Sequence, residues 1–164
     1  PLTWNQPFTF NVYINRQWNS SRADGSWQIF VLGNVWTSSA CFWTTIIDST
    51  SWEGSSYYNK YRVWTWWNDK TASQTNTVWE WNMITVTNNS WDVKLYLNWT
   101  QILNQTISFN ISANTFTIGS FPTTVWSQYQ WFYWYMSNFI VESVVRSADE
   151  VSQYYNQTKS NYGL

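Results

Sequence analysis

Residues 135–155 read YMSNFIVESVVRSADEVSQYY, and this stretch predicts a strand that runs into a short helix. Phe139 and Val141, extended by Val144, alternate with polar neighbours in the two-residue period of a strand that has one buried face. Ser147 then opens a pattern typical of a helix start. We therefore expect a buried strand followed by a helix that closes the fold.

The helix start carries a capping box, Ser147-Ala148-Asp149-Glu150. Ser147 can accept a hydrogen bond from the backbone N–H of Glu150, and the Glu150 carboxylate can accept one from the N–H of Ser147. Asp149 and Glu150 also place negative charge at the positive end of the helix dipole. One apolar stripe follows at helical spacing, made up of Val151, Tyr154 and Tyr155. The pattern predicts a docked C-terminal helix over residues 147–156, not an active site.

The rest of the chain reads as short strands separated by turn signals. The predicted strands are 7–15, 27–32, 41–47, 57–67, 77–87, 92–97, 101–110, 115–118 and 131–141. The segment 68–76 is the most polar of the chain and predicts a loop. Many short strands with one terminal helix indicate an all-β fold, a two-sheet antiparallel jelly-roll β-sandwich with one short C-terminal helix. We expect a single domain spanning residues 1–164.

Composition excludes several classes of function. The charged fraction is 10% and the net charge −1, whereas a nucleic-acid-binding protein normally shows a basic face. The chain has no His and a single cysteine, Cys41, which excludes an intramolecular disulfide and argues against a typical zinc site. The longest apolar run, within 131–141, is far shorter than the roughly 20 residues of a membrane-spanning helix. We expect a soluble protein that neither binds nucleic acid nor inserts into a membrane.

Several segments resemble one family. SNFIV at 137–141, followed by RSADEVSQYY at 146–155, is similar to the closing segment of LamG-like, concanavalin A-like jelly rolls, the lectin and glucanase group that includes laminin G and pentraxin domains. WNMITVT at 81–87 and VKLYLN at 93–98 resemble the central hairpin of that family, and FTIGS at 116–120 its next strand. The ending, 155–164, most resembles single LamG-like modules of bacteriophage virion proteins. The resemblance implies a lectin-like sandwich.

Catalysis is not expected. Glucanase relatives of this fold carry alternating carboxylates on one strand, in the pattern E-x-D-x-E, and this sequence has no such triplet. Glu80 stands alone between two Trp residues, and Asp149 and Glu150 belong to the helix start. Without His, a Ser or Cys nucleophile also lacks its usual base. No catalytic residue is therefore assigned.

The resemblance implies Ca²⁺ as a candidate cofactor, since relatives often bind it through loop carboxylates at the edge of the sandwich. Four aspartates lie in predicted loops or at their borders: Asp24, Asp48, Asp69 and Asp92. Coordination of Ca²⁺ needs several oxygen ligands that converge, and each of these residues is isolated in the sequence. An Asp in a turn usually caps its own backbone. The turn role is favoured and the calcium alternative stays open; no other cofactor is expected.

Aromatic residues are unusually frequent, with 16 Trp, 11 Tyr and 9 Phe. Sugars present C–H faces that stack on aromatic rings, and amide side chains bind their hydroxyl groups. The candidate carbohydrate-binding residues are loop aromatics beside amides: Trp18, Trp52, Trp66, Trp67, Asn68, Trp126 and Tyr129. For each of them, packing in the core or in a subunit interface is the favoured alternative.

Three tryptophans stand where the family usually has glycine or a small turn residue: Trp91, Trp99 and Trp134. A bulky residue with positive φ is strained, so we expect these turns to differ from those of the family.

Two functions follow. The first is a non-enzymatic structural protein of a virion or another surface, such as a capsid decoration, fibre or tail accessory module, which contacts other copies of itself or other virion proteins through aromatic-rich interfaces. The alternative is an adhesin that binds host glycans through loop aromatics, with or without Ca²⁺. Both place the protein on a virion surface or outside the cell.

Overall fold

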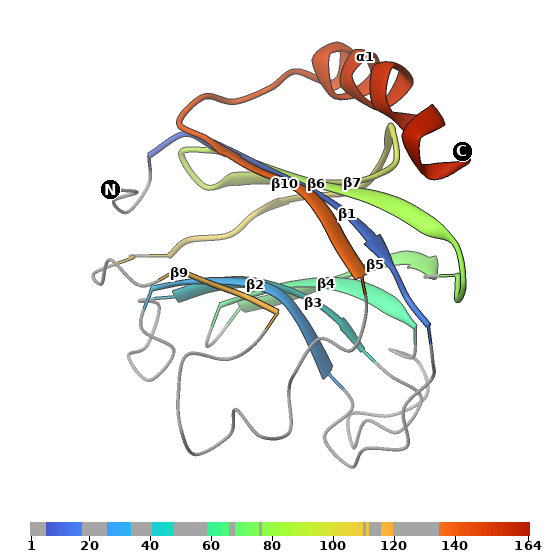
Figure 1. Cartoon of the computed structure of the whole chain (residues 1–164). Coiled ribbons are helices and arrows are strands. Elements are labelled where there is room, and N and C mark those ends of the chain that lie inside the picture. The colour runs from blue at the N-terminus through green and yellow to red at the C-terminus, as the bar shows by residue number, and fades with distance from the viewer. Residues whose placement is uncertain are drawn as a thin grey trace.

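Two five-stranded antiparallel sheets pack face to face, and one helix lies on the outside of the first sheet (Figure 1). The computed structural model describes residues 6–17, 26–33, 41–47, 59–65, 68–75, 77–109, 111, 116–119 and 135–164. This architecture is the all-β jelly-roll sandwich with a short C-terminal helix that the sequence predicts. The described part of the chain contains no helix that is long and apolar enough to cross a membrane.

The first sheet has the strand order β10-β1-β6-β7-β8. Its strands are β1 (Phe8–Asn15), β6 (Trp81–Asn89), β7 (Asp92–Leu97), β8 (Thr100–Thr106) and β10 (Tyr135–Glu142). β1 pairs with β6 on one side and with β10 on the other, so Thr9 lies opposite both Thr87 and Glu142. This pairing brings the end of β10, and with it the helix start, next to the first strand.

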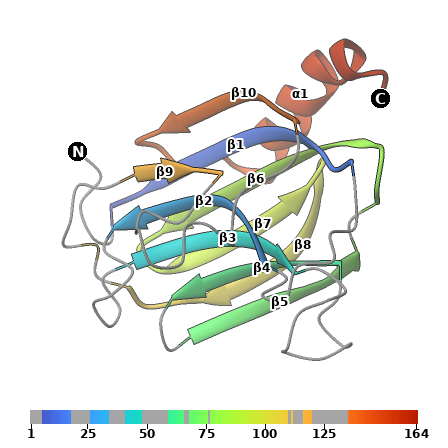
Figure 2. The same ribbon diagram turned by 60° about the horizontal axis from the view of Figure 1, so that its bottom comes forward.

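The second sheet has the order β5-β4-β3-β2-β9, which lies in front of the first sheet in Figure 2. Its strands are β2 (Ser26–Gly33), β3 (Cys41–Ile47), β4 (Lys60–Thr65), β5 (Asn68–Thr75) and β9 (Phe116–Ile118). The prediction of a loop over 68–76 is therefore wrong. β5 is polar because it is an edge strand; its pairing with β4 begins at Thr65 and Asn68, and it buries Ala72 in the core.

The core lies between the sheets and is rich in phenylalanine. Alternate residues of β1 point inward, and the ring of Phe10 lies 3.8 Å from that of Phe30 in the opposite sheet. Phe42 contacts Phe8 and Phe109 at centroid distances of 5.8 and 4.9 Å. Each such side chain removes a large apolar area from water, so these rings contribute much of the attraction between the two sheets.

The helix α1 (Ala148–Thr158) docks on the outer face of the first sheet through a second apolar cluster. The buried members are Tyr13, Met83, Tyr96, Val151 and Tyr155. Both hydrogen bonds of the predicted capping box are present at the helix start. The 3-10 turn η3 (Lys159–Tyr162) follows, and its Tyr162 ring stacks on Tyr13 at 3.8 Å. The predicted docked helix is confirmed.

The strand before the helix is less buried than its pattern indicates. β10 is an edge strand, and in it only Phe139 among the predicted apolar residues contacts the core, through Phe10. Val141 is 39% exposed and Val144 is 55% exposed, so the prediction that they are buried is wrong. A bulge at Asn138, which has a φ of 55°, interrupts the register of β10 on β1 and displaces the alternation.

The structure describes two of the three turns that carry a tryptophan, those at Trp91 and Trp99. Between β7 and β8 the positive φ falls on Asn98 and not on Trp99, so this turn avoids the strain as expected. Between β6 and β7 both Ser90 and Trp91 have positive φ, 50° and 79°, so there the bulky residue does take the strained conformation. A hydrogen bond from Trp91 Nε1 to the carbonyl of Phe109 accompanies it. Trp134 lies outside the described residues.

Candidate functional site

A polar groove lies on the outer face of the first sheet, beside the start of α1. Strand alternation points side chains of β6, β7 and β8 outward, and the helix covers only part of this face. The groove encloses about 440 Å³. We call it the α1 groove; its lining residues are Thr87, Asn89, Asp92, Lys94, Tyr96, Gln101 and residues 145–148.

One wall of the groove is the connection between β10 and α1, which buried Thr9 ties to the sheet. The Thr9 hydroxyl donates a hydrogen bond to the Val144 carbonyl at 2.8 Å and accepts one from the Arg146 N–H at 2.9 Å. Arg146 also binds Glu142 through two nitrogens, at 2.5 and 2.6 Å. This wall is therefore held by both backbone and side-chain contacts.

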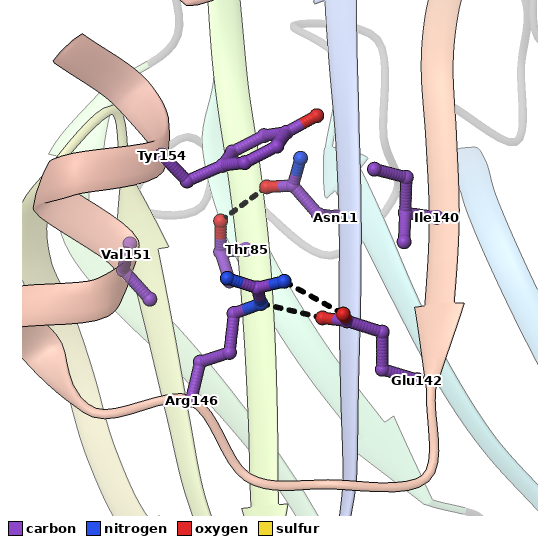
Figure 3. Close-up of a pocket in the computed structure, with 7 residues that line it drawn as sticks. All are labelled: Asn11, Thr85, Ile140, Glu142, Arg146, Val151 and Tyr154. Carbon is purple, nitrogen blue, oxygen red and sulfur yellow. Dashed lines mark hydrogen bonds and ion pairs between the residues drawn. The ribbon is translucent and has the colours of Figure 1, made fainter. Parts of the chain in front are cut away.

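Behind Arg146 lies a smaller pocket between the sheet and the helix, shown in Figure 3. Thr85 donates a hydrogen bond to Asn11 Oδ1 at 2.5 Å, and Tyr154 extends over Asn11. The Nδ2 of Asn11 is buried and has no hydrogen-bond partner among the described residues. The cavity measures about 10 Å³, which is close to the minimum space for one water molecule. This pocket fits a water, and the α1 groove is the site with room for a larger ligand.

Two tyrosines, Tyr13 on β1 and Tyr154 on α1, lie between the helix and the sheet. Burial raises the pKa of Tyr154 above its ordinary value, and Asn138 donates a hydrogen bond to its hydroxyl at 2.9 Å. Burial also raises the pKa of Tyr13 to about 12, while its hydroxyl lies 2.6 Å from that of Thr158. These groups stay neutral at physiological pH and fix the helix on the sheet.

The charged residues around the α1 groove occur in pairs. Lys94 Nζ lies 3.4 Å from Asp92 Oδ2, both on β7. The hydrogen bond from Arg146 holds the pKa of Glu142 below its ordinary value of 4.5, and the same contact raises the pKa of Arg146. Glu150 accepts the N–H of Ser147, which lowers the pKa of that carboxyl. The charged side chains around the groove are therefore paired with one another, and neutral hydrogen-bonding groups remain to bind a ligand.

The Glu142–Arg146 pair makes stability depend on pH in the acid range. A lowered folded-state pKa means that the pair contributes stability above the unfolded-state value near 4.5, and that this contribution is lost as the pH falls through the lower folded-state value. We expect Glu142→Gln to flatten the fall of unfolding free energy below about pH 4.5, as measured by urea denaturation across pH. Arg146→Gln should flatten it equally; an unchanged pH profile in both variants would contradict this assignment.

The structure leaves the predicted carbohydrate-binding residues largely untested. Trp18, Trp52, Trp66, Trp67, Trp126 and Tyr129 lie outside the described residues. Asn68 begins β5, with its backbone opposite Thr65. On the same hairpin, the guanidinium of Arg62 lies 4.3 Å from the ring centroid of Trp64. A sugar-binding role for the loop aromatics therefore stays a prediction.

The calcium candidates are partly placed. Asp24 and Asp48 lie outside the described residues. Asp69 binds Arg62, and Asp92 faces Lys94. Within the described ranges no three His, Cys, Asp or Glu side chains gather as metal ligands would. Asp69 and Asp92 thus have cationic partners, and calcium binding through any of the four aspartates stays a prediction.

Sequence reasoning did not find the α1 groove. Asp92, Lys94 and Tyr96 follow a two-residue period, but such polar positions on a strand usually mark a solvated face. The groove exists because β1 pairs with β10 and so brings residues 145–148 over β6 and β7. No local pattern in the sequence specifies that pairing.

Comparison with known proteins shows the fold. No family model matches the sequence, and no curated protein sequence matches it. Among solved structures, an inferred carbohydrate-binding protein from Bacteroides ovatus superposes with a TM-score of 0.71 at 18% identity, over 93% of this chain and 42% of that one. This chain therefore spans less than half the length of that protein.

Two further structures match over about two thirds of their own length. A heptameric SAP-like pentraxin from Limulus polyphemus matches with a TM-score of 0.64 at 14% identity, over 92% of this chain and 70% of that one. Domain 4 of an extracellular GH43 arabinanase from Geobacillus stearothermophilus, solved with arabinotriose, matches with a TM-score of 0.63 at 12% identity, over 93% and 67%. The fold is that of the concanavalin A-like, LamG-like lectin sandwiches, as the sequence resemblance implies.

Proposed function

We propose that this chain is a non-enzymatic carbohydrate-binding module that holds a glycan in the α1 groove. The observation that carries the proposal is the groove itself: a hollow of about 440 Å³, within the size range of small-ligand sites, lined by polar groups from three strands and the helix start. Asn89, Gln101 and Ser147 are exposed and can each donate and accept hydrogen bonds, as a sugar hydroxyl does. These groups suit a ligand that carries many hydroxyls.

An aromatic ring is also available on this face of the sheet. Trp99, in the turn between β7 and β8, is 52% exposed, and its ring lies 4.8 Å from Tyr155 on the docked helix. An exposed ring of this kind offers an apolar surface for the C–H face of a sugar. Buried Tyr96, on the neighbouring strand β7, lines the α1 groove.

Binding is favoured over hydrolysis. Most glycoside hydrolases act through two carboxylates that flank the bond to be cleaved. Among the described residues that line the α1 groove, Asp92 is the single carboxylate, and it faces Lys94. Structures that share the fold support the proposal, since one is an inferred carbohydrate-binding protein and another was solved with arabinotriose.

The experiment is a glycan array with the labelled protein, followed by calorimetry with the best glycan. We expect saturable binding, with a dissociation constant that is unchanged by EDTA if no calcium takes part. Absence of binding to every glycan on a broad array would contradict the proposal. Loss of binding in EDTA with recovery on adding Ca²⁺ would instead support the calcium-assisted alternative, and would direct attention to Asp24 and Asp48.

A second candidate is a structural subunit of a virion or another extracellular surface. The observation in its favour is a set of exposed apolar side chains along the two adjacent edge strands β9 and β10: Phe116, Ile118, Tyr135 and Val141. Phe116 contacts Phe139 at 5.4 Å, so the two edges are continuous. Light scattering tests this role: a monomer at all concentrations would argue against self-assembly through this edge.

A further inference from the structure

We infer that the α1 groove selects neutral glycans and discriminates against those whose bound sugar carries a carboxylate, an inference that rests on the proposed carbohydrate binding. The carboxylate of an acidic sugar is held most strongly by charge-assisted hydrogen bonds from a cationic side chain. A cation that is already paired with a carboxylate of the protein is less able to supply them. Three sources of positive charge border the groove: Lys94, Arg146 and the N-terminus of α1. Each has a negative partner within this chain.

Lys94 is the cation on the floor of the groove. Its Nζ lies 3.4 Å from Asp92 Oδ2, and both side chains are partly exposed. A ligand carboxylate could approach Lys94 only beside the Asp92 carboxylate, which repels it. The attraction to Lys94 is therefore offset by a like charge at short range.

Arg146 lies at the junction of the groove and the pocket in Figure 3, and its guanidinium faces Glu142. The two hydrogen bonds, at 2.5 and 2.6 Å, form the bidentate geometry in which an arginine binds a carboxylate. A ligand carboxylate would have to displace Glu142 and leave it without a partner near the groove. The two guanidinium nitrogens that would bind a ligand carboxylate are therefore already bound to Glu142.

The positive end of the helix is also neutralised from within. Glu150 accepts the N–H of Ser147 at 2.7 Å, and Ser147 accepts the N–H of Glu150 at 3.3 Å. Asp149 adds a second carboxylate in the first turn. These charges oppose the helix dipole, so this end attracts anions weakly.

The remaining lining groups are neutral and hydrogen-bonding. The exposed hydroxyl and amide groups of Asn89, Gln101 and Ser147 can bind sugar hydroxyls whether or not the sugar is charged. A neutral sugar thus gains hydrogen bonds in the groove, whereas its acidic counterpart adds repulsion from Asp92, a carboxylate that lines the groove. We expect this repulsion to make the affinity for acidic sugars lower than the affinity for neutral ones.

The test uses matched pairs on an array and in calorimetry: methyl glucoside with methyl glucuronide, methyl galactoside with methyl galacturonide, and lactose with 3′-sialyllactose. We expect the neutral member of each bound pair to bind about tenfold more tightly at low salt, corresponding to about 1.4 kcal/mol. Asp92→Asn releases Lys94 and should narrow this ratio. Glu80→Gln changes the net charge equally at an exposed position that does not line the groove, and should leave the ratio unchanged.

The outcomes separate the two claims. If acidic members bind as tightly as neutral members or more tightly, the selectivity is wrong while carbohydrate binding stands. If Glu80→Gln narrows the ratio as much as Asp92→Asn, the effect is one of overall charge, and the local assignment is wrong. If no member of any pair binds and the broad array is also negative, the proposed function fails and the selectivity with it.

Discussion

Val151→Asp is expected to lower the free energy of unfolding by about 3–5 kcal/mol, the range observed when a buried charge has no partner. Val151 is 1% exposed and packs in the cluster that joins α1 to the first sheet. A carboxylate there would lie among Tyr13, Met83 and Tyr96. Arg146 lines the neighbouring pocket, but its guanidinium is already bound by Glu142. The helix should leave the sheet before the sandwich itself unfolds, because the core between the sheets contains no residue of α1.

The matched control is Gln153→Asp, an exposed position on the same helix. It introduces the same charge and should change the unfolding free energy by less than about 0.5 kcal/mol. Urea denaturation measures both, and near-ultraviolet circular dichroism reports the release of the tyrosine cluster. Equal stability of the two variants would contradict the docking of α1 through Val151.

Ala148→Trp is expected to weaken glycan binding about 100-fold, equivalent to about 2.7 kcal/mol. Ala148 is the first residue of α1, is exposed, and lines the α1 groove. An indole at this position would fill space that the ligand needs. The fold should persist, because the difference in helix propensity between Ala and Trp is below about 0.7 kcal/mol.

Gln153→Trp is the control for this variant, since it adds the same ring to the exposed face of α1, away from the residues that line the groove. Calorimetry with the best glycan from the array should show wild-type affinity for Gln153→Trp and a near-complete loss for Ala148→Trp. Wild-type affinity in both would show that the glycan binds elsewhere. Loss in both would indicate a general effect of an added ring on α1.

The closing helix is the part of the fold that local sequence predicts best. The capping box places the helix start through contacts between residues three apart, and the apolar stripe places its buried face. Both signals are complete within residues 147–155, so no knowledge of the tertiary structure is needed. The assignment of an all-β sandwich succeeds for a similar reason, since the two-residue period recurs along the chain.

The failures arise where tertiary position overrides local pattern. β5 has the composition of a loop but pairs with β4. As an edge strand it has a backbone partner on one side only, and it contributes one side chain, Ala72, to the core. Val141 follows the buried period but lies on the edge strand β10, next to a bulge. Neither position in the sheet can be read from composition.

The candidate site depends on pairing over long distances in the sequence. Thr9 joins to Val144 across 135 residues, and Asn11 joins to Thr85 across 74. The sequence instead indicates loop aromatics as the candidate site, because aromatic rings beside amides are the residue types that most often contact sugars. Polar residues of β7 and β8 carry no such signal, because an ordinary solvated strand has the same pattern.

The central claim is that the glycan lies in the α1 groove, and locating a bound glycan tests it most directly. The measurement is a crystal structure, or a map of backbone amide shifts, with the best glycan from the array. The account predicts contacts or shifts at Lys94, Gln101 and the start of α1, and none around Trp64 on the second sheet. A glycan seated against the second sheet, with the α1 groove unchanged, would contradict it.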